Sequence, residues 1–152
     1  MVTTEQIKEL RDSTGISVMQ CKKALEEAGG DMDKALDILR KKSSEIAAKR
    51  VDKTFGAGII QGYVHSTYKT ATLVELVCET DFVSGNEEFK TLARDIAMHV
   101  TALNPIDNAT LMSQPFIKNP DVTIEGLIQA AIQKFGEKIA VARYTRFAVL
   151  EK

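Results

Sequence analysis

The hydrophobic spacing of this chain changes near Gly56 and Gly58, and this change constrains the fold more than any other feature. Before these glycines, apolar residues recur every three to four positions, as they do along one face of a helix. After them, residues 59–65 and 70–79 are rich in Ile, Val, Tyr and Thr, which is typical of strands. We therefore expect an α+β protein in which a helical part precedes a sheet.

The first 42 residues contain three helix start signals. Thr3 followed by Gln6 matches a capping box. Ser17 followed by Gln20 matches another, and Asp31 is a favoured N-cap residue. The residues expected to be buried are Ile7 and Leu10 in the first helix, Val18, Cys21, Leu25 and Ala28 in the second, and Met32, Ala35, Leu36 and Leu39 in the third. Helices of about ten residues are marginal alone, so we expect residues 1–42 to form a three-helix bundle.

A basic stretch, residues 40–53, follows the bundle. It holds six Lys or Arg residues and two acidic residues. One interpretation is a solvated helical connector over residues 43–56, which is what such charge runs usually are. The other is a strip that contacts RNA or a partner protein. We favour the connector.

Residues 57–152 are expected to form a β-β-α-α-β core with a three-stranded antiparallel sheet. Residues 66–69 separate the first two strands and are expected to form a hairpin turn. A third strand is expected at 139–150. In the second strand, alternation predicts a core face that consists of Thr72, Val74, Leu76 and Cys78.

Two helices are expected between the second and third strands. The longer one begins near Phe89 and ends at Asn104-Pro105. The other is capped by Thr123 and ends at Gly136. The intervening residues 106–121 are rich in turn-forming residues and are expected to form turns.

The composition excludes several classes of function. Twenty Lys and Arg residues balance 21 Asp and Glu, whereas nucleic-acid binding requires a basic surplus. Cys21 and Cys78 provide neither a disulfide framework nor a zinc site. No apolar run approaches 18 residues, and the N-terminus lacks the features of a signal peptide. We expect a cytoplasmic protein with no metal, no cofactor, no nucleic-acid partner and no membrane segment.

A thiol hydrolase is the enzyme class to consider, because Cys78 would need a nearby histidine and the chain has His65 and His99. Cys78 lies on the apolar face of its strand, and His99 lies in an apolar helical stripe. Both are therefore expected to be core residues. No phosphate-binding lysine loop or GxSxG motif occurs. We expect the chain not to be an enzyme and to have no catalytic residues.

The segment between Thr70 and Phe89 holds five acidic residues and no basic residue, which predicts a negative edge. Asp81 and Phe82 lie within it, where the second strand gives way to the long helix. Either this pair forms an exposed wedge that enters a partner, or Phe82 packs into the core while Asp81 caps the turn. Periodicity does not distinguish these alternatives.

The sequence Glu79-Thr80-Asp81-Phe82-Val83, followed by Asn86-Glu87-Glu88-Phe89, resembles the signature of the elongation factor Ts family. Members of this family are guanine-nucleotide exchange factors of elongation factor Tu. Residues 10–15 and 21–25 are similar to the family's ubiquitin-associated-like bundle. Later blocks occur in the family's order at residues 95–100, 114–118, 136–139 and 143–147. The resemblance covers about residues 3–105 and 111–150.

The resemblance implies roles for individual residues in the motif. Asp81 and Phe82 match the pair that enters the nucleotide domain of elongation factor Tu near its magnesium site. Thr80 and Val83 match the positions that hold the loop.

The resemblance also implies a second contact with the same GTPase domain, made by the N-terminal bundle. Arg11, Val18 and Met19 match the positions that contact a helix of that domain. The family usually has two methionines at the latter positions, so Val18 is a departure.

Only residues 106–113 stand where family members carry an additional helical stretch, and often a second core half. A single core resembles the short members, which pair as homodimers. The resemblance therefore implies a homodimer with residues 57–152 as the dimerisation domain. The alternative function is a ubiquitin-associated-like adaptor without exchange activity, against which the intact Asp81-Phe82 pair argues.

Overall fold

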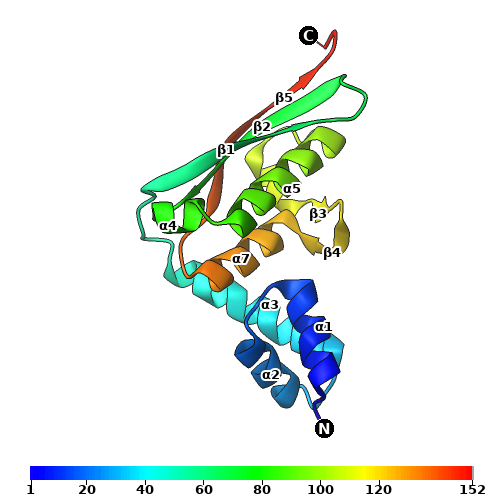
Figure 1. The fold of residues 1–152 in the computed structure, drawn as a ribbon, viewed down its shortest axis with the longest axis vertical. Helices are drawn as coiled ribbons and strands as arrows, with labels where there is room; N and C mark the ends of the chain where they lie inside the picture. The colour runs from blue at the N-terminus through cyan, green and yellow to red at the C-terminus, as the bar shows by residue number, and fades with distance from the viewer. Residues whose placement is uncertain (152) are drawn as a thin grey trace.

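The computed structural model describes residues 1–151 and has the α+β fold predicted from the sequence (Figure 1). Its sheet has the antiparallel strand order β1-β2-β5. The strands are β1 (Ala57–Val64), β2 (Thr70–Cys78), β3 (Pro115–Phe116), β4 (Asn119–Thr123) and β5 (Ala140–Ala148). The helices are α1 (Thr4–Thr14), α2 (Val18–Glu27), α3 (Met32–Lys49), α4 (Asp81–Ser84), α5 (Glu87–Leu103), α6 (Asn108–Ser113) and α7 (Ile124–Phe135).

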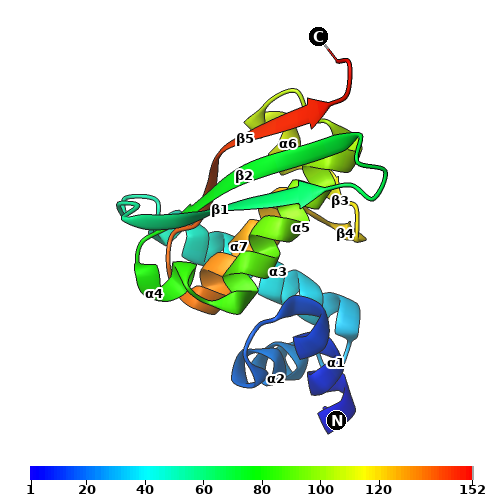
Figure 2. The ribbon, with the colours of Figure 1, turned by 45° about the horizontal axis from the view of Figure 1, so that its top comes forward.

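One face of the sheet is covered by helices and the other is open. Figure 1 shows the helices on one side of the sheet, and Figure 2 shows β1, β2 and β5 with no helix in front of them. The predicted core face of β2 is confirmed, since Thr72, Val74, Leu76 and Cys78 are all buried. Val74, Leu76 and Cys78 form a core with residues of α5 and α7, among them Phe89, Ile96 and Ile128.

The predicted helix starts are confirmed, with one difference at Gln20. Thr3 and Gln6 form the full capping box, and Asp31 caps α3. The Ser17 hydroxyl accepts from the Gln20 N–H at 3.3 Å. The Gln20 side chain, however, accepts from Gln133 Nε2 at 2.7 Å instead of reaching back to its own cap. A nearly buried Gln133 amide needs an acceptor, and α7 brings it within reach of Gln20.

The prediction that Val18 is buried was wrong. Cys21 and Leu25 on the same stripe are fully buried, but the Val18 side chain is 51% exposed. Val18 is the first residue of α2, at the end of the stripe, and lies outside the buried cluster of the bundle.

Helix α3 continues without a break through most of the basic stretch. Its first half, with Ala35 and Leu39, packs in the bundle's cluster. Its second half contributes Ile46 and Ala47 to the core beneath the sheet. The division into residues 1–42, 43–56 and 57–152 stays a prediction, and its first boundary falls inside this single helix.

Residues 106–121 were expected to form turns only, which was wrong. Asp107 caps the short helix α6 by accepting from the Thr110 N–H at 2.7 Å, and Leu111 of α6 is fully buried. Strands β3 and β4 then form a small antiparallel pair, in which Phe116 is buried. These elements were not predicted because each is only two to six residues long and contains or adjoins turn-forming residues.

Among residues 1–151, no helix has both the length and the apolar character needed to cross a bilayer.

Candidate functional site

Helix α4 is a single helical turn that displays one aromatic ring. The Phe82 side chain is 90% exposed, whereas the next residue, Val83, is only 4% exposed and packs in the core. The core alternative for Phe82 was therefore wrong; the ring is exposed, and its role as a wedge that enters a partner stays a prediction. The segment was expected to be a loop, but Ser84 and Gly85 donate backbone hydrogen bonds to the carbonyls of Thr80 and Asp81 and close a helical turn.

Glu137 holds the start of this turn. One oxygen of its carboxylate, Oε1, accepts from the backbone N–H of Glu79 at 3.1 Å and from that of Thr80 at 3.0 Å. The other oxygen, Oε2, accepts from the Thr80 hydroxyl at 2.6 Å. Because the Thr80 hydroxyl donates to Glu137, it does not accept a hydrogen bond from a backbone N–H of α4. Thr80 therefore does not cap this helix with its side chain. Three hydrogen bonds to one carboxylate fix the residue that directly precedes Asp81.

The Glu79 side chain joins the segment before α4 to the end of α3. Its carboxylate accepts from Arg50 Nε at 2.9 Å and from Arg50 Nη2 at 2.8 Å, in a two-pronged ion pair. It also accepts from the backbone N–H of Lys138. The Arg50 guanidinium holds the pKa of Glu79 below its ordinary value, and the pKa of Arg50 is raised in turn. The last turn of α3 is thus tied to the segment that leads into α4.

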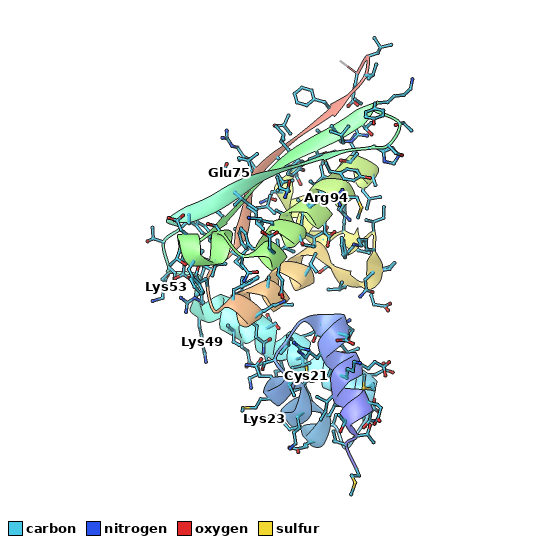
Figure 3. All side chains as sticks on the ribbon, in the orientation of Figure 1. Cys21, Lys23, Lys49, Lys53, Glu75 and Arg94 are labelled. Atoms are coloured by element: carbon cyan, nitrogen blue, oxygen red, sulfur yellow. The ribbon has the colours of Figure 1, made fainter. Side chains whose placement is uncertain are left out.

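Lys138 ties the chain that leaves α3 to this region as well. Its ammonium donates to the carbonyl of Val51 at 2.9 Å and to that of Lys53 at 3.2 Å. It lies 4.6 Å from the centre of the Phe55 ring, within the range of a cation–π contact. Figure 3 shows Lys49 and Lys53 beside this end of α3.

Sequence reasoning gave no role to Arg50, Glu137 or Lys138. Arg50 was counted only as part of a basic stretch, and residues 136–139 only as a block similar to the family. Arg50 comes from one segment and the adjacent residues Glu137 and Lys138 come from another, and the two segments meet only after folding. The signal that was present is an acidic and a basic residue placed directly after Gly136, which ends α7 in the left-handed conformation with φ 72°.

The predicted negative edge is largely neutralised in the folded chain. Four of its five acidic residues form ion pairs with basic residues: Glu75 with Arg143, Glu79 with Arg50, Glu87 with Lys90 and Glu88 with Lys134. Three of these four partners lie far away in the sequence and so were not visible in a local count of charges. Within residues 1–151, Asp81 is the member of the five for which the structure shows no ion pair, and its side chain is exposed.

The three residues implied in the second contact lie near one end of the bundle. Arg11 is exposed near the end of α1, and Met19 near the start of α2 is 79% exposed. Val18 precedes it and is half exposed. The next residue, Gln20, binds Gln133 of α7, so this end of the bundle is fastened to the core. Gln133 also accepts from the Ser43 hydroxyl of α3.

His99 and Cys78 have the structural roles that the sequence predicted. His99 is fully buried; its Nδ1 accepts from the Ile117 N–H at 3.2 Å, so its Nε2 donates to Gln114 Oε1 at 2.9 Å. Burial lowers the pKa of His99 and favours this neutral form. The Cys78 thiol donates to the Thr80 carbonyl at 3.3 Å, and burial raises its pKa. Among residues 1–151 no histidine is hydrogen-bonded to this thiol, and no three His, Cys, Asp or Glu side chains gather as metal ligands would.

The ion pair between Glu79 and Arg50 makes stability depend on pH. Because the pKa of Glu79 in the folded chain lies below its ordinary value of 4.5, the pair stabilises the fold above pH 4.5. This stabilisation is lost as the pH falls through the lowered pKa. We expect Glu79→Gln to melt below the wild type at pH 7, with a gap that narrows toward pH 3, as measured by thermal unfolding with circular dichroism.

A matched control for this measurement is Glu87→Gln, since Glu87 forms an exposed pair with Lys90 at 3.1 Å. Its melting gap at pH 7 should be the smaller one, because exposed pairs contribute little. A Glu79→Gln gap of equal size at pH 7 and pH 3 would contradict the prediction.

Comparison with known proteins supports the resemblance seen in the sequence. The model of the family described as Elongation factor TS matches residues 4–107 and 79–152. Elongation factor Ts of Carboxydothermus hydrogenoformans is 36% identical, with 99% of this chain and 90% of the relative covered. That of Leptospira biflexa is 39% identical, with 97% and 98% covered, and that of Thermosipho melanesiensis is 37% identical, with 99% and 100% covered.

The alignments with these three relatives run over 193 to 196 positions, whereas this chain has 152 residues. The relatives therefore contain residues that this chain lacks, although nearly all of this chain is matched. Since the family model and the relatives both cover almost the whole sequence, the chain belongs to the elongation factor Ts family of translation elongation factors.

Proposed function

We propose that this chain is a guanine-nucleotide exchange factor, which binds elongation factor Tu in its GDP form and promotes release of GDP. The observation that carries the proposal is the Phe82 ring, 90% exposed on a turn whose neighbouring residues are anchored. Exposed aromatic side chains on a rigid support are typical of the residues that dominate protein interfaces. Phe82 would enter an apolar slot of the GTPase, while the exposed Asp81 carboxylate disturbs the magnesium and phosphate site.

The energetics of exchange require more than one contact. If the factor lowers the affinity of the GTPase for GDP, then GDP lowers the affinity of the GTPase for the factor by the same ratio, because the coupling is reciprocal. Each tenfold loss of nucleotide affinity needs about 1.4 kcal/mol of differential binding. Burial of one phenylalanine contributes roughly 1.5 to 3 kcal/mol, so Phe82 alone accounts for a factor of about ten to a hundred. Asp81 and a second contact must supply the remainder.

The second contact is proposed to involve Arg11, Val18 and Met19. Helix α3 joins this end of the molecule to α4: its first half packs in the bundle and Arg50, its C-cap residue, binds Glu79. Its 18 residues correspond to a length of about 27 Å. A continuous helix holds the two contacts at a fixed separation, which favours binding of both to one GTPase domain. The basic stretch would then be a rigid spacer.

In this function the chain makes and breaks no covalent bond and supplies no cofactor of its own, so we propose that it is not an enzyme. Translation elongation takes place in the cytoplasm, and we place the chain there.

We expect the wild-type chain to accelerate release of fluorescent GDP from elongation factor Tu, and Phe82→Ala to lose about tenfold or more of that acceleration. Truncation removes the apolar contact at the tip of the wedge, and tenfold corresponds to about 1.4 kcal/mol. Asp81→Ala should lose activity as well. Stopped-flow fluorescence measures both variants, and circular dichroism checks their folding.

Tyr68→Ala is the matched control, since Tyr68 is an aromatic residue that is 83% exposed at the other end of the β1–β2 hairpin. It should exchange as the wild type does. An inactive wild type would refute exchange and leave the adaptor alternative, whereas a fully active Phe82→Ala would refute only the wedge.

For the second contact, we expect Met19→Ala to raise the concentration of factor that half-saturates exchange by about tenfold. The side chain is 79% exposed, and burying a methionine on a partner contributes roughly 1.5 to 3 kcal/mol. The maximal rate at saturation should change little, because the wedge remains. A titration of exchange rate against factor concentration separates these effects; an unchanged half-saturation would contradict the contact.

We also propose that the chain pairs with a second copy through the open face of its sheet. Ile60, Val64, Leu73 and Phe147 are exposed there, each to more than half of its surface. The ion pair of Glu75 with Arg143 lies on the same face, beside Ile60. A largely polar outer face is usual for a half-covered antiparallel sheet, so four large exposed apolar side chains there are typical of an interface. The same face on both copies allows a two-fold symmetric contact.

We expect sedimentation equilibrium at micromolar concentration to give about twice the chain mass of 16.7 kDa. Leu73→Lys should return the mass to that of a single chain, since it places a charge among the exposed apolar side chains of this face. Glu45→Lys, which changes an exposed residue of α3, is the control and should stay dimeric. A single-chain mass for the wild type would rule out the dimer under those conditions.

A further inference from the structure

We propose that Glu137 is a positioning residue for nucleotide exchange, which holds the peptide that leads into α4 so that Phe82 faces the GTPase. This inference rests on the proposed exchange function. Glu137 lies 55 positions beyond Phe82 in a different part of the chain, yet its carboxylate binds the two residues that directly precede Asp81.

The anchoring of α4 shows why such a residue is needed. A helix of four residues is one turn long, and a single turn is unstable by itself. Its second half is held by Val83 and Ser84, which are buried. Its first half has no buried side chain, and Thr80, Asp81 and Phe82 are all exposed. This half is fixed to the rest of the molecule by the three hydrogen bonds that Glu137 accepts and by the one that the Cys78 thiol donates to the Thr80 carbonyl.

The position of Glu137 is itself well defined by the fold. It follows Gly136, whose left-handed backbone ends α7 and whose N–H binds the Ile132 carbonyl at 2.8 Å. The next residue, Lys138, donates its backbone N–H to the Glu79 carboxylate. Glu79 and Glu137 thus each accept a backbone hydrogen bond from the other's segment. These reciprocal hydrogen bonds hold the segment before α4 next to the segment before β5.

Removal of the Glu137 carboxylate would leave three donors of Glu79 and Thr80 without their acceptor in the folded chain. Water can replace it, because Thr80 is exposed, so the fold survives while the turn gains freedom. The turn must lose this conformational freedom when Phe82 enters the partner. The entropy cost makes the complex with Phe82 inserted less stable. The bundle contact is untouched, so initial binding of the GTPase should be preserved.

The test is a titration of GDP release against factor concentration for three variants of the full chain. We expect Glu137→Ala to lower the maximal release rate about tenfold while the half-saturating concentration stays within about twofold of the wild type. Glu137→Gln should keep most of the rate, because its amide oxygen still accepts and its amide nitrogen can donate to the Thr80 hydroxyl. In a Phe82→Ala background, Glu137→Ala should cause less than a twofold further loss, since it acts through the ring.

The matched control is Asp107→Ala, which removes another acidic side chain that accepts a backbone hydrogen bond, from Thr110 at the start of α6. It should change thermal stability but not the maximal release rate. If Glu137→Ala does not fold, the exchange rates of Thr80→Val and Thr80→Ser are compared instead. Only Thr80→Val removes the hydroxyl that donates to Glu137. We then expect Thr80→Val to exchange about threefold more slowly than Thr80→Ser.

The inference is overturned if Glu137→Ala, or Thr80→Val where that variant is used, keeps the full maximal rate. It is equally overturned if the losses from Glu137→Ala and Phe82→Ala multiply. Failure of the proposed function looks different: the wild type itself would not accelerate release, and no variant would differ from it.

Discussion

Two carboxylates, Glu79 and Glu137, join parts of this molecule that are distant in the sequence. Each accepts a backbone hydrogen bond from the other's segment, and Glu79 adds the two-pronged ion pair with Arg50. Three segments that are distant in the sequence meet there: the end of α3, the chain from the end of β2 to the start of α4, and the chain between α7 and β5. Without these two acceptors the exposed first half of α4 would have fewer contacts that hold it to the core.

The elements themselves follow from local rules and could be predicted. The cap residues Thr3, Asp31 and Thr123 mark true helix starts, and the alternation of β2 identifies its buried face correctly. Such signals depend on residues a few positions apart, which a sequence displays directly. Elements of two to six residues, as between α5 and α7, carry too few residues for a periodic signal, and turn-forming residues mask them.

The candidate site was predictable in its exposed residues and not in their support. The motif around Asp81 and Phe82 was visible as a local string, whereas Phe82 required the structure to settle its exposure. Glu137 and Gln133 could not be found, because a hydrogen bond between residues 57 or 113 positions apart leaves no local pattern. Charge was misread for the same reason: a segment without basic residues acquires them from α3, α7 and β5 upon folding.

Helix α3 is shared by two hydrophobic clusters, with Leu39 in one and Ile46 in the other. A helix that completes two cores makes the melting of either one costly for its neighbour, so the bundle and the sheet half should unfold in one cooperative transition. If the chain were cut near residue 42, the sheet half would lose the continuous helix that covers part of its core. We therefore expect the chain to unfold and move as one unit rather than as two modules joined by a linker.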